Sequence, residues 1–120
     1  MANRASYIEF LIEQLSPLGE ITARRLFGGH SLYCNGTVFA LVARDTLYLK
    51  VDDQTRPEFA ALGLETFHPF GDARHSMQYY QAPAELFEHS DAVHLWGGRA
   101  VAAGRRAARK RPAGRKKRAR

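Results

Sequence analysis

This 120-residue sequence contains a single cysteine, Cys34, and no apolar run that approaches the roughly 20 residues of a membrane span. With one cysteine, neither a disulfide within the chain nor a cysteine-rich metal site can form, and this fits a reducing compartment. The N-terminus leads directly into a segment with Glu9 and Glu13, without the apolar stretch of a signal peptide. We therefore expect a cytoplasmic protein that is neither secreted nor inserted into a membrane.

Acidic residues are absent from the last sixteen positions, although the whole chain contains 12 of them. Residues 1–104 hold 8 basic and 12 acidic residues, a net charge of −4, whereas residues 105–120 hold ten basic residues. Such a cluster attracts polyanions, so any affinity for nucleic acid is expected in this segment. The candidate nucleic-acid-binding residues are Arg105, Arg106, Arg109, Lys110, Arg111, Arg115, Lys116, Lys117, Arg118 and Arg120.

Apolar residues other than alanine are also nearly absent beyond Gly104. Residues 105–120 therefore cannot offset the entropy lost on ordering, and we expect a disordered basic tail. Ala107-Ala108 could extend the preceding helix briefly, up to Pro112. The length of the remainder suits one domain with one modest core, which we place at residues 1–104.

The first periodic segment predicts a helix, because four apolar residues recur at i, i+3, i+4 and i+7: Ile8, Leu11, Ile12 and Leu15. Ser6 to Glu9 matches a capping box at its start. Pro17 and Gly19 are expected to end it.

Short aromatic and β-branched runs after Ile21 predict strands. The Asn35-Gly36 pair favours a type I′ turn joining Ser31–Cys34 to Thr37–Ala43. A second tight turn at Arg44-Asp45 leads into residues 46–51, which gives a three-stranded meander. Gly28-Gly29 is expected to bend or bulge the first of these strands.

Asp52-Asp53 supplies capping carboxylates for a short second helix that ends near Gly63. Residues 66–70 and 75–81 flank Gly71-Asp72-Ala73-Arg74 and predict another hairpin.

Pro83 opens a helical turn, and Ser90-Asp91 caps a last helix that turns four residues inward: Val93, Trp96, Ala100 and Val101. Gly97-Gly98 is expected to weaken this helix and to kink or fray it. The resulting order, α-β-β-β-α-β-β-α, predicts an α+β fold with two layers, a five-stranded antiparallel sheet packed by helices.

Three segments together resemble the N-terminal domain of the TfoX/Sxy family: Ala23-Arg24-Arg25-Leu26-Phe27-Gly28-Gly29 with the hairpin that follows, Leu47-Tyr48-Leu49-Lys50-Val51-Asp52, and Ser76-Met77-Gln78-Tyr79-Tyr80 with Pro83. The likeness covers about residues 5–103. The resemblance implies the two-layer fold of secretion chaperones and a regulator of natural transformation competence. It also implies a transcription-related protein partner, since larger members act with the cyclic-AMP receptor protein at competence promoters. The family is not known for an enzymatic activity, so the resemblance implies no catalytic residues and no cofactor.

Catalytic and metal-binding alternatives have little support in the sequence. Cys34 lies beside a turn without an evident base or activating charge, which favours a structural cysteine. The five histidines lack a recognisable ligand spacing, and no second cysteine could complete a zinc site. Gly28-Gly29 lacks the residues that complete a phosphate-binding loop, so a backbone bend is the better interpretation.

Two further groups have a structural and a functional interpretation. Arg24 and Arg25 point to opposite faces of a strand, so at most one is directed toward the core, and the other could belong to a partner surface. Four tyrosines could stack bases on an open sheet face, but the body lacks the basic groove this needs, which favours packing: Tyr33, Tyr48, Tyr79 and Tyr80.

The sequence supports two hypotheses from different classes. The first is a non-enzymatic TfoX-like regulator whose body binds a protein partner and whose basic tail contacts DNA without sequence preference. The alternative is a stand-alone nucleic-acid-binding or nucleoid-associated protein whose body only folds or dimerises. In either case an edge strand of the small sheet could support a symmetric homodimer.

Overall fold

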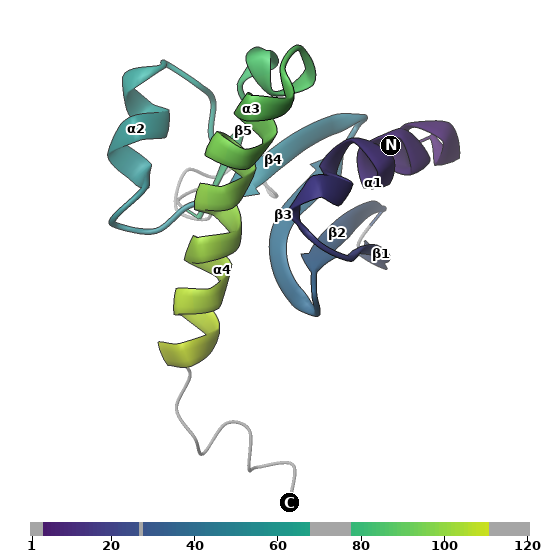
Figure 1. Ribbon diagram of the computed structural model, residues 1–120, viewed down its shortest axis with the longest axis horizontal. Coiled ribbons are helices and arrows are strands. Elements are labelled where there is room, and N and C mark those ends of the chain that lie inside the picture. The colour runs from purple at the N-terminus through teal and green to yellow at the C-terminus, as the bar shows by residue number, and fades with distance from the viewer. Residues whose placement is uncertain (1–3, 27, 68–77, 111–120) are drawn as a thin grey trace, which may run out of the picture.

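The computed structural model describes residues 4–26, 28–67 and 78–110, and its core is one sheet with helices packed against it (Figure 1). The helical elements are α1 (Ala5–Leu15), η1 (Ser16–Leu18), α2 (Arg56–Ala61), η3 (Ala84–Phe87), α3 (Ser90–Ala92), η4 (Val93–Gly97) and α4 (Gly98–Lys110). The strands are β1 (Ile21–Leu26), β2 (Gly29–Cys34), β3 (Thr37–Ala43), β4 (Thr46–Lys50) and β5 (Tyr79–Gln81). No helix among these residues has the length and apolar character that a membrane crossing requires.

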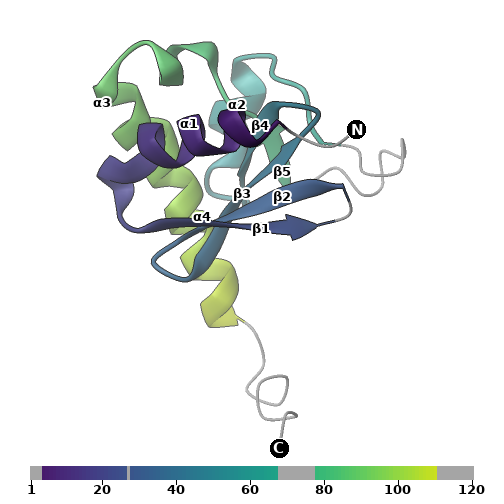
Figure 2. The ribbon, with the colours of Figure 1, turned by 90° about the vertical axis from the view of Figure 1, so that its right-hand side faces the viewer.

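The strands follow one another through the sheet in the order of the chain, and every neighbouring pair is antiparallel. Helix α1 packs on β1, whereas α4 packs along β3 and β4 (Figures 1 and 2). Buried side chains from both helices and from the strands form a single hydrophobic core. The prediction of an α+β fold with a five-stranded antiparallel sheet is therefore confirmed.

The two predicted tight turns are present. Asn35 and Gly36 have φ angles of 50° and 87°, and Arg44 and Asp45 have φ angles of 52° and 57°. Positive φ at both central positions is the mark of a type I′ hairpin turn. The side-chain oxygen of Asn35 also accepts a hydrogen bond of 2.9 Å from the backbone N–H of Glu20, so the same residue holds the start of β1.

The prediction of one bent strand around Gly28-Gly29 is wrong. Residues 21–26 and 29–34 form two separate strands, β1 and β2, paired from Leu26↔Gly29 to Ile21↔Cys34. Gly28 has a φ angle of 84°, which glycine adopts without steric cost, and the chain reverses there instead of bending.

The predicted hairpin after the second helix is only partly within the described residues. Thr66 makes an isolated bridge to Tyr80, and a strand, β5, is present only at Tyr79–Gln81. Residues 68–77, which include the predicted loop Gly71-Asp72-Ala73-Arg74, lie outside the described residues. Within the described residues, four strands precede α2 and one follows it, whereas three and two were predicted.

Helix α1 buries the predicted stripe at Ile8, Leu11 and Leu15, but its start differs from the predicted capping box. The helix begins at Ala5, one residue before Ser6, and its N-cap residue, Arg4, makes no side-chain capping hydrogen bond. Arg4 instead donates two hydrogen bonds to the Asp45 carboxylate, from its backbone N–H (2.9 Å) and from its Nε (3.0 Å). The start of α1 is thereby anchored to the β3–β4 turn.

The second helix is present and short, with Pro57 in its first turn and Gly63 after its end at a φ angle of 72°. Pro57 suits the first turn, where its missing N–H has no partner in any case, and Gly63 adopts the left-handed conformation that ends helices. Phe59 is fully buried, whereas Leu62 is 51% exposed.

The C-terminal helix turns its four predicted residues inward, and the expected fraying at the glycine pair does not occur. A π-helical segment, η4, ends at Gly97, and α4 continues directly from Gly98. A Cβ atom at Gly97 would lie 2.7 Å from Leu18 Cδ1, so this glycine allows η1 to pack closely against the helix. Packing against η1 thus offsets the low helix propensity of the pair.

The predicted boundary at Gly104 falls inside α4, which extends to Lys110. Disorder from residue 105 is therefore wrong for residues 105–110, and the brief extension suggested by Ala107-Ala108 is what the structure shows. Residues 111–120 lie outside the described residues.

At Gly104, α4 approaches the sheet closely. A Cβ atom at this position would lie 2.3 Å from the backbone oxygen of Val38 in β3, too short for a real contact. A backbone atom of a paired strand cannot move aside as a flexible side chain can. Residue 104 must therefore be glycine for α4 to lie at its observed distance from β3.

We predict that Gly104→Ala lowers the free energy of unfolding by about 1–3 kcal/mol, because the added methyl group forces α4 away from β3. The matched control is Gly98→Ala in the same helix, where a Cβ atom would meet nothing within 4 Å. That change should leave stability unchanged or raise it by up to about 1 kcal/mol, since alanine is the better helix former. Urea unfolding of both variants measures the difference, and equal stability of the two would contradict this account of Gly104.

Candidate nucleic-acid interface

Four of the ten candidate nucleic-acid-binding residues lie in α4, and they differ in their contacts with the folded body. Arg105, Arg106 and Arg109 belong to its last turns, and Lys110 is its final residue. The other six lie outside the described residues: Arg111, Arg115, Lys116, Lys117, Arg118 and Arg120. Figure 1 shows that α4 carries the C-terminal end of the described chain away from the sheet.

Arg106 is engaged with the folded body. Its Nε donates to Asp52 Oδ2 at 2.5 Å and its Nη2 donates to Asp52 Oδ1 at 3.0 Å, a two-pronged pair with both side chains less than a quarter exposed. Asp52 Oδ1 also accepts from the backbone N–H groups of Gln54 (3.1 Å) and Thr55 (3.2 Å). Arg106 therefore connects the C-terminal helix to the loop between β4 and α2.

These contacts shift the ionisation of both partners toward the charged forms. The hydrogen bond from the Arg106 guanidinium lowers the pKa of Asp52 from 3.8 to about 2, with a smaller lowering by the backbone N–H groups of Thr55 and Gln54. The same hydrogen bond raises the pKa of Arg106. Arg106 is thus a structural residue whose charge is already compensated.

A second pair of the same kind lies two turns earlier on α4. Arg99 donates to Glu58 of α2 through Nε and through Nη2, the latter at 3.0 Å, and its guanidinium lies 5.2 Å from the centre of the Trp96 ring. Hydrogen bonding from Arg99 lowers the pKa of Glu58. The two pairs together hold the segment from Asp52 to Glu58 against one side of α4.

Arg105 and Arg109 face away from this contact. They are four residues apart, so they lie on one stripe of the helix, and both are exposed. Within residues 4–26, 28–67 and 78–110, neither has an acidic side chain in ion-pair range. Their position near the C-terminus of α4 also complements the helix dipole, a stabilising role that needs no ligand.

Three of the four tyrosines share one face of the sheet, and the fourth lies on the other face. The strand register places Tyr33, Tyr48 and Tyr79 on the face of the sheet opposite to the core, whereas Tyr80 lies on the core side and contacts Phe59 at 6.0 Å. Arg24 lies over the Tyr33 ring at 5.6 Å and Lys50 over the Tyr79 ring at 5.0 Å. All four tyrosines are partly buried, and burial raises the pKa of Tyr48 and Tyr79.

Cys34 is fully buried in β2, and its Sγ lies 3.4 Å from the backbone oxygen of Leu18 as a weak donor. Burial raises the pKa of the thiol, which disfavours the thiolate that nucleophilic or metal-binding chemistry requires. Among the described residues, no three His, Cys, Asp or Glu side chains come together as metal ligands. Arg24 and Arg25 alternate across β1 as predicted, and both are exposed.

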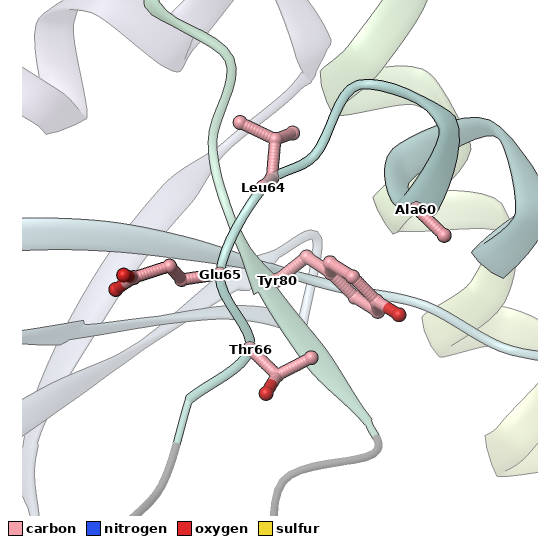
Figure 3. Close-up of a pocket in the computed structure, with 5 residues that line it drawn as sticks. All are labelled: Ala60, Leu64, Glu65, Thr66 and Tyr80. Atoms are coloured by element: carbon pink, nitrogen blue, oxygen red, sulfur yellow. The ribbon is translucent and has the colours of Figure 1, made fainter.

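A shallow hollow of about 460 Å³ lies between the end of α2 and β5. Figure 3 shows its lining residues, Ala60, Leu64, Glu65, Thr66 and Tyr80, with the Glu65 carboxylate and the Tyr80 hydroxyl directed to opposite sides. An acid and a hydroxyl that diverge in this way are not placed to act together on one bound atom, because each would need to lie within hydrogen-bond reach of it.

The acidic partners of α4 were not predicted from the sequence. A signal for them was present, since Asp52 and Glu58 are six residues apart and Arg99 and Arg106 are seven apart, a spacing that suits two segments lying side by side. This match was not recognised because the folded domain was predicted to end at Gly104, which placed Arg106 in the disordered tail.

We predict that Arg106→Ala lowers the free energy of unfolding by about 1 kcal/mol at pH 6, as expected for a partly screened ion pair. Arg105→Ala is the matched control, one residue earlier in the same helix, and should change stability by less than about 0.5 kcal/mol. Urea unfolding of the full chain measures both.

The stability lost in Arg106→Ala should depend on pH in a defined direction. The folded-state pKa of Asp52, about 2, lies below its ordinary value of 3.8. The contribution of the pair is therefore complete above about pH 5 and declines as the pH falls from about 4 to 2. The difference between wild type and variant should shrink over that range, and a difference that stays constant down to pH 2 would exclude the Asp52 pair as its source.

Comparison with known proteins adds one positive result. The family model described as TfoX N-terminal domain matches residues 13–104, most of the folded body and the greater part of α4. A comparison with curated proteins found no match.

Proposed function

Because the chain belongs to the TfoX N-terminal domain family, we propose that it is a non-enzymatic co-regulator of transcription and competence. Its body binds a transcription-related protein partner, and its basic C-terminal residues contact DNA without sequence preference. The partner selects the promoter, and the basic residues add affinity to the resulting complex. Phosphate contacts of this kind position a protein on DNA but carry no sequence information.

The proposal of a DNA contact rests on how basic residues without an acidic partner are distributed along α4 and the residues that follow it. Residues 1–110 contain 12 basic and 12 acidic residues and so have no net charge, whereas residues 111–120 contain six basic residues and no acid. Within α4, Arg99 and Arg106 are compensated by acids of the body, while Arg105 and Arg109 are exposed without such partners among the described residues. The uncompensated cations of α4 therefore lie near its C-terminal end, and further basic residues follow them along the chain.

Counterion release explains how such residues would bind. Duplex DNA condenses cations along its backbone, and each phosphate that an arginine or lysine neutralises releases them into solution. Affinity gained in this way is steeply salt-dependent and nearly independent of base sequence. It requires no fixed geometry of the basic residues.

The partner-binding surface that we propose lies beyond the Glu58–Arg99 pair, on the side of this pair away from Arg106. Leu62 and Leu95 are 51% and 46% exposed, and they lie one turn beyond Glu58 and Arg99 on their respective helical segments. Because the segment from Asp52 to Glu58 runs antiparallel to α4, with Asp52 beside Arg106 and Glu58 beside Arg99, both leucines lie at the same end of this contact. The larger members of the family act with the cyclic-AMP receptor protein, which makes it the first candidate to occupy this surface.

We predict that DNA binding requires the residues after Lys110. Full-length chain should bind labelled duplexes of unrelated sequence nearly alike, with a slope of log affinity against log salt of about −4 to −5 if about half of the uncompensated cations engage phosphate. A fragment ending at Lys110 retains the whole of α4 and should lose most of the affinity while unfolding like the full chain.

Two substitutions in α4 sharpen this test. Arg109→Ala should make the salt slope less steep by up to about 1, whereas Arg106→Ala should change it little, because Arg106 is held by Asp52. Undiminished binding by the fragment would overturn the assignment to the C-terminal residues. Strong discrimination between sequences would show that the body reads bases.

We also predict that the body alone binds the protein partner. Immobilised fragment 1–110 and full-length chain should both retain purified cyclic-AMP receptor protein, and Leu62→Ser with Leu95→Ser should abolish retention. Leu26→Ser is the matched control, because Leu26 is similarly exposed (41%) but lies on β1. DNA binding by the full chain without retention of this partner would favour a stand-alone nucleic-acid-binding protein.

A further inference from the structure

Among the strands that the structure describes, β1 forms one edge of the sheet and has a neighbour, β2, on one side only. The turn at Asn35-Gly36 makes Cys34 and Thr37 a hydrogen-bonded pair, so Tyr33 and Ser31 direct their backbone groups toward β1. Their partners on β1 are Thr22 and Arg24. The backbone N–H and C=O groups of the alternate residues, Ile21, Ala23 and Arg25, therefore point to the outer edge.

The side chains along this edge carry a charge pattern that is complementary to itself. Glu20, Thr22 and Arg24 alternate along the extended chain and so share one face, and all three are exposed. The acid and the base lie at equal distances on either side of Thr22. A second copy, turned by a two-fold axis through Thr22, would place its Arg24 opposite Glu20 and its Glu20 opposite Arg24.

The alternative registers are less favourable on the same grounds. A two-fold axis at Ala23 would place Arg24 opposite Thr22, which leaves both charges without an opposite partner. An axis at Arg24 or Arg25 would place that arginine opposite itself, and like charges directly opposite each other are destabilising. Only the axis at Thr22 pairs every charge on this face of β1.

The backbone geometry favours the same register. With the axis at Thr22, Ile21 of each copy lies opposite Ala23 of the other, and these are the residues whose N–H and C=O groups point outward. Glu20, Thr22 and Arg24 then occupy the pairs without hydrogen bonds, where Cα atoms are only about 4.5 Å apart and side chains approach most closely. Hydrogen bonding and charge pairing are thus satisfied together.

We propose that two copies of this chain associate through antiparallel pairing of their β1 strands across a two-fold axis at Thr22, with reciprocal Glu20–Arg24 ion pairs. Exposed charges usually protect an edge strand from pairing, because they repel a copy of the same strand. Here the charges at positions 20 and 24 have opposite signs, so they attract those of a second copy in the register centred on Thr22. The proposal is independent of the partner and DNA contacts described above.

The test is sedimentation equilibrium of the full chain and of charge-exchange variants. Wild type should show a monomer–dimer equilibrium that weakens at high salt. Arg24→Glu and Glu20→Arg should each raise the dissociation constant by about tenfold or more, because each places like charges opposite each other twice. The double variant Glu20→Arg with Arg24→Glu should return it to near the wild-type value.

Arg25→Glu is the matched control, since it makes the same charge change on the neighbouring residue but on the other face of β1, opposite Gly19 of the second copy. It should alter the dissociation constant far less than Arg24→Glu. A monomeric wild type at the highest soluble concentration, or a double variant as weak as the single variants, would overturn the proposal.

Crosslinking tests the register directly. In a Cys34→Ser background, Thr22→Cys places a cysteine opposite itself and should form a disulfide-linked dimer under mild oxidation, because facing pairs without hydrogen bonds approach within disulfide range. Ala23→Cys should crosslink poorly, since the axis lies one residue away. Efficient crosslinking of Ala23→Cys with none of Thr22→Cys would exclude the proposed register.

Discussion

The close approach of α4 to β3 at Gly104 sets the position of the C-terminal helix, and much of the remaining structure depends on that position. With the helix against the Val38 backbone, Trp96, Ala100 and Val101 enter the core. The same placement brings Arg99 and Arg106 within reach of Glu58 and Asp52, so that the segment between β4 and α2 is held from its two ends. A larger residue at position 104 would weaken all of these contacts together.

This dependence also separates two kinds of basic residue that look alike in the sequence. Arg106 lies on the side of α4 that meets an acid and becomes part of the fold, whereas Arg105, its neighbour, lies about 100° further around the helix and stays exposed. A run of arginines at the end of a domain is therefore not one functional unit. Whether each arginine pairs with an acid of the fold or stays exposed depends on the side of the helix on which it lies.

Much of the fold could be predicted because its signals are local. The Asn35-Gly36 turn, the inward residues of the last helix and the glycine after α2 follow from backbone preferences and periodicity. The separation of β1 from β2 was missed because a glycine pair is compatible with either a bend or a reversal. The end of α4 and the partner of Arg106 were missed because they depend on a contact between residues 54 positions apart, which no local pattern encodes.

The position of α4 in the chain has a consequence for how the protein is made. Strands β1 to β4 are neighbours in sequence and can pair in succession as soon as they leave the ribosome, since each needs only a short turn. The helix that covers β3 and β4 is the last described element to be synthesised. The apolar face of the nascent sheet therefore stays uncovered until α4 has been synthesised, and exposed apolar surface of this kind is prone to aggregation in that interval.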